Sequence, residues 1–168
     1  MNKVTLVLGG TRSGKSAYAE NLFAGEETPV YLATGAAGDG EMSERIARHK
    51  ERRGERWKTI EEPIGLAAAL LRESRPEQPI LVDCLTLWLG NLMAGDRNVP
   101  QSCDALLRVL SGLNAPVVLV SNEVGWGIVP DNAMARQFRD YAGELHQRVA
   151  AIADSVVLVA AGLPLILK

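Results

Sequence analysis

Short apolar runs rich in β-branched residues recur along the chain, and longer segments with helical spacing separate them. Each run is continuously apolar rather than alternating, which is typical of strands that helices cover on both faces. This pattern predicts parallel βαβ units wound into a single sheet. The predicted strands cover residues 4–8, 30–33, 80–83, 117–120 and 156–159.

The segments between these runs predict helices, because their apolar positions recur with a period of about 3.6 residues. We expect helices over residues 16–24, 43–53, 64–73, 104–113 and 132–152. Glycines at 35–40 and a polar, proline-containing stretch at 95–102 predict loops. Ligands of such sheets bind beyond the carboxyl ends of the strands, so the residues that follow each strand are expected to carry the chemistry.

Length and composition narrow the class of protein. A chain of 168 residues that is 47% hydrophobic and 23% charged predicts one domain, spanning residues 1–168. A formal net charge of -2 offers no basic surface, so nucleic acid is not an expected partner. The sequence shows neither a signal peptide nor an apolar run of the about 20 residues that a membrane span needs, which predicts a cytoplasmic protein.

One segment matches the phosphate-loop pattern G-x-x-x-x-G-K-[ST] and lies between a predicted strand and a predicted helix, which is the context that the pattern requires. In such a loop, backbone N–H groups surround phosphate oxygens, and the helix N-terminus adds a partial positive charge. The fold class predicted is therefore α/β, with a doubly wound, mostly parallel sheet of the P-loop, RecA-like type. The predicted nucleotide-binding residues are Gly9, Gly10, Thr11, Arg12, Ser13, Gly14, Lys15 and Ser16.

Specific roles can be predicted for two residues of this loop and for one acidic residue elsewhere in the chain. Lys15 is expected to contact the outer phosphates, and the Ser16 hydroxyl is expected to bind Mg²⁺. Asp83 ends a predicted strand where P-loop enzymes place a second acidic residue, so it is a predicted magnesium ligand, directly or through water. The alternative for Asp83 is a cap on the turn or helix that follows.

His49 is one of two histidines and lies in a stretch crowded with cations. On a helix, Arg45 would share its face on one side, and Arg52 and Arg53 on the other. Neighbouring cations favour an uncharged and therefore nucleophilic imidazole. The alternative is a solvated charged face without a catalytic role.

Further motifs accompany the phosphate loop and together span nearly the whole chain. They resemble the bifunctional adenosylcobinamide kinase and adenosylcobinamide-phosphate guanylyltransferase family of cobalamin biosynthesis. A phosphate loop alone is shared by many families, whereas the His-Lys and Ser-Asn-Glu-Val-Gly segments make the combination specific. The motifs lie at residues 31–35, 45–50, 57–61, 82–89, 120–125, 127–130 and 161–165.

The resemblance implies an enzyme of two steps, with GTP and ATP as substrates and Mg²⁺ as cofactor. A nucleoside triphosphate phosphorylates adenosylcobinamide, and GTP then donates GMP to adenosylcobinamide phosphate through a guanylylated histidine. The products are adenosylcobinamide-GDP and pyrophosphate, and His49 matches the position of that histidine. The resemblance also implies a homotrimer and further nucleotide contacts from Thr34, Gly35, Ala36, Lys50, Glu51, Arg52, Arg53, Glu61 and Asp83.

Two positions depart from the family pattern, since Gly54 replaces a common proline and His146 replaces a common asparagine. Two other functions stay open at this point. One is a P-loop kinase of another small metabolite without a covalent intermediate, and the other is a RecA-like regulatory module that hydrolyses nucleotide. Glu123 is a candidate for orienting substrate or metal, with loop hydrogen bonding as an equal alternative, and Trp88 is expected to pack in the core.

Overall fold

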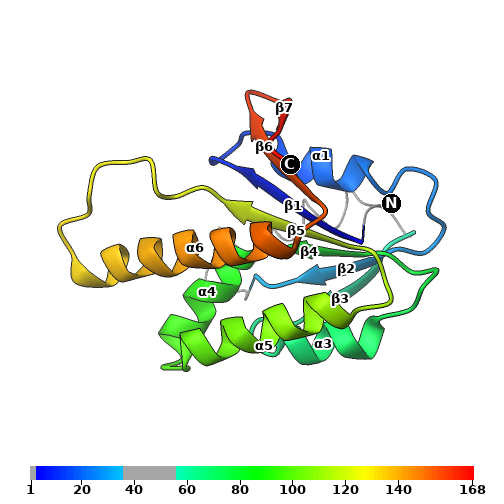
Figure 1. Ribbon diagram of the computed structural model, residues 1–168, viewed down its shortest axis with the longest axis horizontal. Helices are drawn as coiled ribbons and strands as arrows, with labels where there is room; N and C mark the ends of the chain where they lie inside the picture. The colour runs from blue at the N-terminus through cyan, green and yellow to red at the C-terminus, as the bar shows by residue number, and fades with distance from the viewer. Residues whose placement is uncertain (1–2, 36–55) are drawn as a thin grey trace.

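The computed structural model describes residues 3–35 and 56–168, and these form one seven-stranded sheet in the order β3-β2-β4-β5-β1-β6-β7 (Figure 1). Neighbouring strands are parallel except for β6 and β7, which pair antiparallel. The α/β class with a mostly parallel sheet is therefore confirmed. The elements are β1 Val4–Gly9, α1 Lys15–Asn21, β2 Val30–Ala33, β3 Lys58–Glu61, α3 Leu66–Glu73, β4 Ile80–Asp83, α4 Leu85–Ala94, α5 Val99–Gly112, β5 Val117–Asn122, α6 Ala133–Ile152, β6 Ser155–Ala160 and β7 Leu163–Ile166.

The predicted strands all appear, and the predicted helices that fall on described residues appear with shifted ends. The prediction of a loop over residues 95–102 is partly wrong, because α5 begins at Val99. Asn98 caps it by accepting a hydrogen bond from Gln101 N at 3.0 Å, and Pro100 stands in the first turn, where a missing N–H costs nothing. The helix predicted over residues 43–53 lies outside the described residues.

Helices cover the sheet on both faces (Figure 1). α3, α4, α5 and α6 pack on one face around a large apolar cluster, and α1 packs on the other. Trp88 of α4 is fully buried in the larger cluster and donates from Nε1 to Ile64 O at 2.8 Å, which confirms its predicted packing role. On the α1 face, the Trp57 ring lies 4.9 Å from that of Phe23 and 5.8 Å from that of Tyr31, so this tryptophan is also a core residue.

No helix within residues 3–35 and 56–168 combines the length and the apolar character that crossing a bilayer requires. Several helices instead carry one apolar face toward the sheet and a polar face away from it. α6 shows this clearly, since its buried positions are Ala142, Leu145, His146 and Val149, which follow helical spacing.

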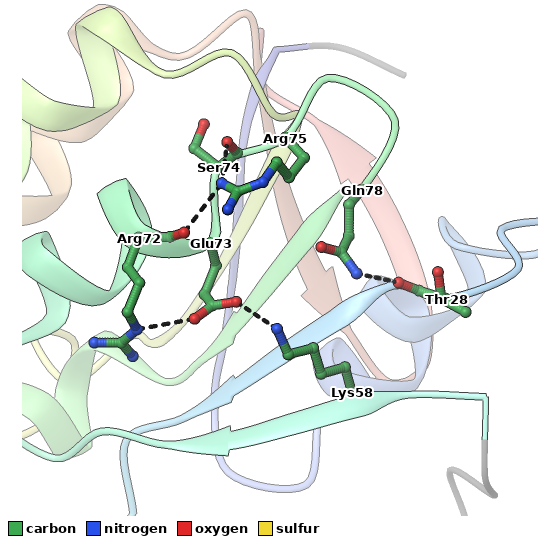
Figure 2. A network of polar contacts seen from close by, with 7 residues as sticks. All are labelled: Thr28, Lys58, Arg72, Glu73, Ser74, Arg75 and Gln78. Atoms are coloured by element: carbon green, nitrogen blue, oxygen red, sulfur yellow. Dashed lines mark hydrogen bonds and ion pairs between the residues drawn. The ribbon is translucent and has the colours of Figure 1, made fainter.

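A polar network fastens the edge strand β3 to α3 (Figure 2). The Glu73 carboxylate, 10% exposed, accepts from Lys58 Nζ at 2.7 Å and from Arg72 Nε at 2.9 Å. The hydrogen bond from Lys58 lowers the pKa of Glu73, and Arg72 adds to this while burial opposes it. The two cations thus make it favourable to bury a carboxylate at the end of α3.

We expect Glu73→Gln to lower the free energy of unfolding by about 1–2 kcal/mol at pH 7, because both charge-assisted hydrogen bonds weaken. A lowered folded-state pKa stabilises the fold above the unfolded pKa of about 4.3 and loses that contribution as the pH falls through the folded-state value. The free energies of unfolding of variant and parent, measured with urea, should therefore converge as the pH falls. Glu77→Gln, at an exposed position on the same connection, is the charge-matched control and should change little. Equal effects of the two substitutions would contradict the assignment.

Candidate functional site

The phosphate-loop residues form a tight turn between β1 and α1. Gly14 has a φ of 95° and Arg12 a φ of 56°, and the first of these favours glycine because other residues are strained there. Ser13 N donates to Gly10 O at 3.3 Å, which closes the turn. The backbone thus curls in the way that a cradle for an anion requires.

Two features of this loop fit a phosphate ligand. Lys15, at the start of α1, is buried, and its Nζ donates to Gly10 O at 3.1 Å, so the ammonium group lies over the turn. Ser13 Oγ is buried without a hydrogen-bond partner in the described part of the chain. Unsatisfied buried hydroxyls are uncommon in folded proteins and are expected where a ligand completes the site.

The hairpin of β6 and β7 supports the loop from outside. Ala161 and Gly162 both have positive φ, at 52° and 79°, as a two-residue hairpin turn requires. Gly162 N donates to Ser13 O at 2.8 Å, and a Cβ added to Gly14 would lie 3.1 Å from Gly162 Cα. Sequence reasoning missed this contact, because Ala-Gly is not one of the residue pairs that usually mark a two-residue hairpin turn.

Asp83 ends β4 at the same edge of the sheet, where β5 separates it from β1. Tyr31 of β2 donates from its hydroxyl to Asp83 Oδ2 at 2.7 Å, which fixes the orientation of the carboxylate. No group of three His, Cys, Asp or Glu in the described ranges forms a metal cluster. A magnesium ion at a nucleotide takes only one or two protein ligands, so the hydroxyl of Ser16 and the carboxylate of Asp83 are a suitable donor set.

Thr34 joins the ends of β2 and β4. Its buried hydroxyl donates to Cys84 O at 2.7 Å and accepts from Cys84 N at 2.8 Å, and Thr34 O accepts from Asn91 Nδ2 at 2.7 Å. The side chain therefore has a structural role, and its predicted contact with nucleotide stays a prediction. Burial raises the pKa of Cys84 to about 11, so this thiol is not a nucleophile at neutral pH.

The remaining predicted residues divide into two groups. Gly35 follows Thr34 directly beyond the carboxyl end of β2, and Glu61 ends the edge strand β3. The other predicted residues lie outside the described ranges, and they are His49, the proposed nucleophile, and the proposed nucleotide contacts Ala36, Lys50, Glu51, Arg52 and Arg53.

The second histidine, His146 of α6, belongs to a polar cluster that sequence reasoning did not predict. Its Nε2 hydrogen-bonds to the buried Ser121 Oγ at 2.7 Å, and its Nδ1 lies 3.9 Å from Glu123 Oε2. Burial lowers the pKa of His146, and the nearby carboxylate of Glu123 opposes this only in part. Glu123 also accepts a loop hydrogen bond from Gly125 N at 2.6 Å, as one of its two interpretations predicted.

Comparison with solved structures confirms the fold. An ATPase of the type III secretion system of pathogenic bacteria superposes with a TM-score of 0.58, at 13% identity, over 93% of this chain and 50% of that one. A protein from Pyrococcus horikoshii superposes with a TM-score of 0.54, at 8% identity, over 99% of this chain and 86% of that one. At such identities the likeness shows the fold alone, which is the predicted P-loop type.

Comparison with characterised sequences is more specific. A bifunctional adenosylcobalamin biosynthesis protein, CobP, from Pseudomonas aeruginosa is 49% identical over 97% of this chain and 96% of its own length. The CobU proteins of the same description from Salmonella typhimurium and Escherichia coli are 40% and 36% identical, each over 97% of this chain and 98% of their own length. The model of one family matches residues 5–167. The chain therefore belongs to the cobinamide kinase / cobinamide phosphate guanyltransferase family.

Proposed function

We propose that this chain phosphorylates adenosylcobinamide and then transfers GMP from GTP to adenosylcobinamide phosphate, releasing adenosylcobinamide-GDP and pyrophosphate. The observation that carries the proposal is the curled phosphate loop with Lys15 over it, at the same sheet edge as the oriented carboxylate of Asp83. Membership in the cobinamide kinase / cobinamide phosphate guanyltransferase family indicates that the acceptor is a cobinamide. The names of the three relatives, which are all called bifunctional, support both steps.

The nucleotide, GTP or ATP, binds with its phosphates in the loop from Gly9 to Ser16. Lys15 exchanges its contact with Gly10 O for a phosphate oxygen, which is a stronger partner because it is charged. Mg²⁺ held by Ser16 and Asp83 neutralises charge on the phosphates when it is bound. Tyr31 keeps the Asp83 carboxylate aimed, so little reorganisation is needed when the ligand arrives.

His49 is the proposed nucleophile of the second activity. An imidazole nitrogen attacks the α-phosphorus of GTP, a P–N bond forms, and pyrophosphate leaves. A phosphate oxygen of adenosylcobinamide phosphate then attacks the same phosphorus, and the P–N bond breaks to return the free histidine. Dividing the transfer in this way lets each displacement face one incoming group at a time.

The residues around His49 in the sequence are proposed to stabilise these displacements. Lys50, Arg52 and Arg53 offset the charge that develops on the α-phosphate and on pyrophosphate. In the sequence, residues 36–55 come after Gly35. Gly35 lies just beyond the end of β2, and β2 pairs with β4 so that Ala33 lies beside Asp83. The further proposed nucleotide contacts are Thr34, Gly35, Ala36, Glu51 and Glu61.

Substitution of His49 by Ala should abolish the covalent label that GTP carrying ³²P on its α-phosphate leaves on the protein. We expect guanylyl transfer to fall by at least about 1000-fold and the kinase rate to stay within about threefold, because only one activity uses the nucleophile. Denaturing electrophoresis after acid or base treatment measures the label, which should be acid-labile and base-stable. GTP labelled on its γ-phosphate is the control and should leave no label.

The outcomes separate the alternatives. A wild-type protein that phosphorylates cobinamide without becoming labelled would be a kinase without a covalent intermediate. A protein that hydrolyses nucleotide but yields no corrinoid of higher mass would be a regulatory module. Retention of the label after His49→Ala would rule out this histidine as the nucleophile.

Lys15→Met should lower both activities by at least about 100-fold, because each step loses the cation at its phosphates. Titration with a fluorescent nucleotide analogue and assays of both steps measure the effect. Lys3→Met removes an exposed lysine directly before β1, outside the phosphate loop, and is the matched control. Wild-type nucleotide affinity in folded Lys15→Met protein would contradict the proposed cradle.

We also propose that residues 1–168 form a single domain and that the protein is a homotrimer. Large apolar side chains of the edge strand β7 are exposed, including Leu163, Leu165 and Ile166, and they offer surface for contact between subunits. Sedimentation equilibrium should give about three times the chain mass of 18.1 kDa. A monomeric mass across micromolar concentrations would refute the trimer.

A further inference from the structure

Glu123 lies beside the phosphate loop because of strand pairing. β5 runs parallel to β1, and their last paired residues are Gly9 and Asn122. One residue further on, Glu123 N donates to Gly9 O at 3.0 Å. The backbone of Glu123 is thus hydrogen-bonded to the first residue of the phosphate loop. Strand pairing in the sheet therefore fixes the position of Glu123.

The side chain of Glu123 is held in one orientation. Oε1 accepts from Gly125 N at 2.6 Å, and a Cβ added at Gly125 would lie 2.9 Å from that oxygen, so glycine permits the close contact. Arg139 of α6 donates from Nη2 to Gly125 O at 2.6 Å and so anchors the loop to the helix. A carboxylate fixed in this way is preorganised for chemistry.

The surroundings of Glu123 leave its carboxylate accessible. The side chain of Glu123 is 20% exposed, and its Oε2 faces His146 Nδ1 at 3.9 Å. His146 is uncharged near neutral pH, because burial lowers its pKa, and an uncharged neighbour does not neutralise the carboxylate as a cation would. Ser121 fixes the imidazole from the other side.

Other carboxylates near the strand ends in the described part of the chain are engaged or distant. Asp83 accepts from Tyr31 and is the proposed magnesium ligand. Glu62 Oε1 accepts from Gly65 N at 2.7 Å, in the turn before α3. Glu61 ends β3, which β2, β4 and β5 separate from β1.

We propose that Glu123 is the general base of the phosphorylation step, a role that rests on the kinase activity proposed above. The acceptor hydroxyl gives its proton to the Glu123 carboxylate as its oxygen bonds to the γ-phosphorus. The bond from that phosphorus to the β,γ-bridging oxygen breaks, and the nucleoside diphosphate leaves. Glu123 then returns the proton to solvent.

The same loop suits a large acceptor. Beyond Glu123 it exposes Trp126 and Ile128, which are 79% and 97% accessible. Arg139 also donates to Ile128 O at 3.1 Å, so the backbone that carries these side chains is held on α6. An acceptor with a broad apolar face lying on this loop brings its hydroxyl to the carboxylate and limits the access of water.

Glu123→Gln tests the proposal, because the amide oxygen still accepts from Gly125 N while basicity is lost. We expect kcat for phosphorylation of cobinamide to fall at least about 100-fold with the nucleotide KM within about threefold. Guanylyl transfer to cobinamide phosphate supplied directly should stay within about threefold, since that acceptor carries no hydroxyl proton to remove. Thermal unfolding of the variant establishes that it is folded.

Chemical rescue supplies the second measurement. In Glu123→Ala, added formate should raise the phosphorylation rate at least about tenfold and should leave the wild-type rate unchanged, because a small carboxylate replaces the missing base. Phosphorylation by Glu123→Gln within about threefold of wild type would overturn the assignment, and so would equal loss of both activities. If the wild-type protein itself fails to phosphorylate cobinamide, the proposed function fails, which is a different result.

Discussion

The geometry of the phosphate loop depends on the position of β1 between β5 and β6. Glu123 N bonds to Gly9 O on one side, and Gly162 N bonds to Ser13 O on the other. A Cβ at Gly9 would lie 2.4 Å from Ser13 Oγ and 2.6 Å from Val159 O, so the strands close around the loop only because this residue is glycine. The loop is therefore shaped by the sheet as much as by its own sequence.

The same sheet edge brings different kinds of group together without burying an unpaired charge. Asp83 is paired with a phenol, Thr34 satisfies both backbone groups of Cys84, and Lys15 is paired with a carbonyl oxygen. The Gly10 carbonyl oxygen and the Tyr31 phenol are neutral, so a phosphate and its cation can replace or join these two contacts without breaking an ion pair there. Charged partners would have to be displaced first, which would cost binding free energy.

Much of this arrangement could be predicted from the sequence, because buried parallel strands are continuous apolar runs and the phosphate loop has a fixed spacing. The edge strands β3 and β7 were missed because they are largely exposed, and their residues therefore do not form the continuous apolar runs that mark a buried strand. α4 was missed because its residues are apolar on nearly every side, which hides helical periodicity. Pairings such as Tyr31 with Asp83 join residues far apart in the chain, and no local pattern signals them.

The two histidines show how far local environment decides chemical role. Burial keeps the imidazole of His146 uncharged, which nucleophilic attack also requires, yet Nε2 is occupied by Ser121 and the side chain is only 8% exposed. A nucleophile must bring a free nitrogen within reach of the α-phosphorus, so His146 cannot accept a guanylyl group without breaking its own cluster. The sequence holds only one other histidine, His49, among the cations that such a transfer requires. The replacement of asparagine by histidine at residue 146 therefore affects the packing around Glu123 and does not create a second nucleophile. Glu123 and His49 belong to different steps of the proposed reaction, phosphorylation and guanylyl transfer.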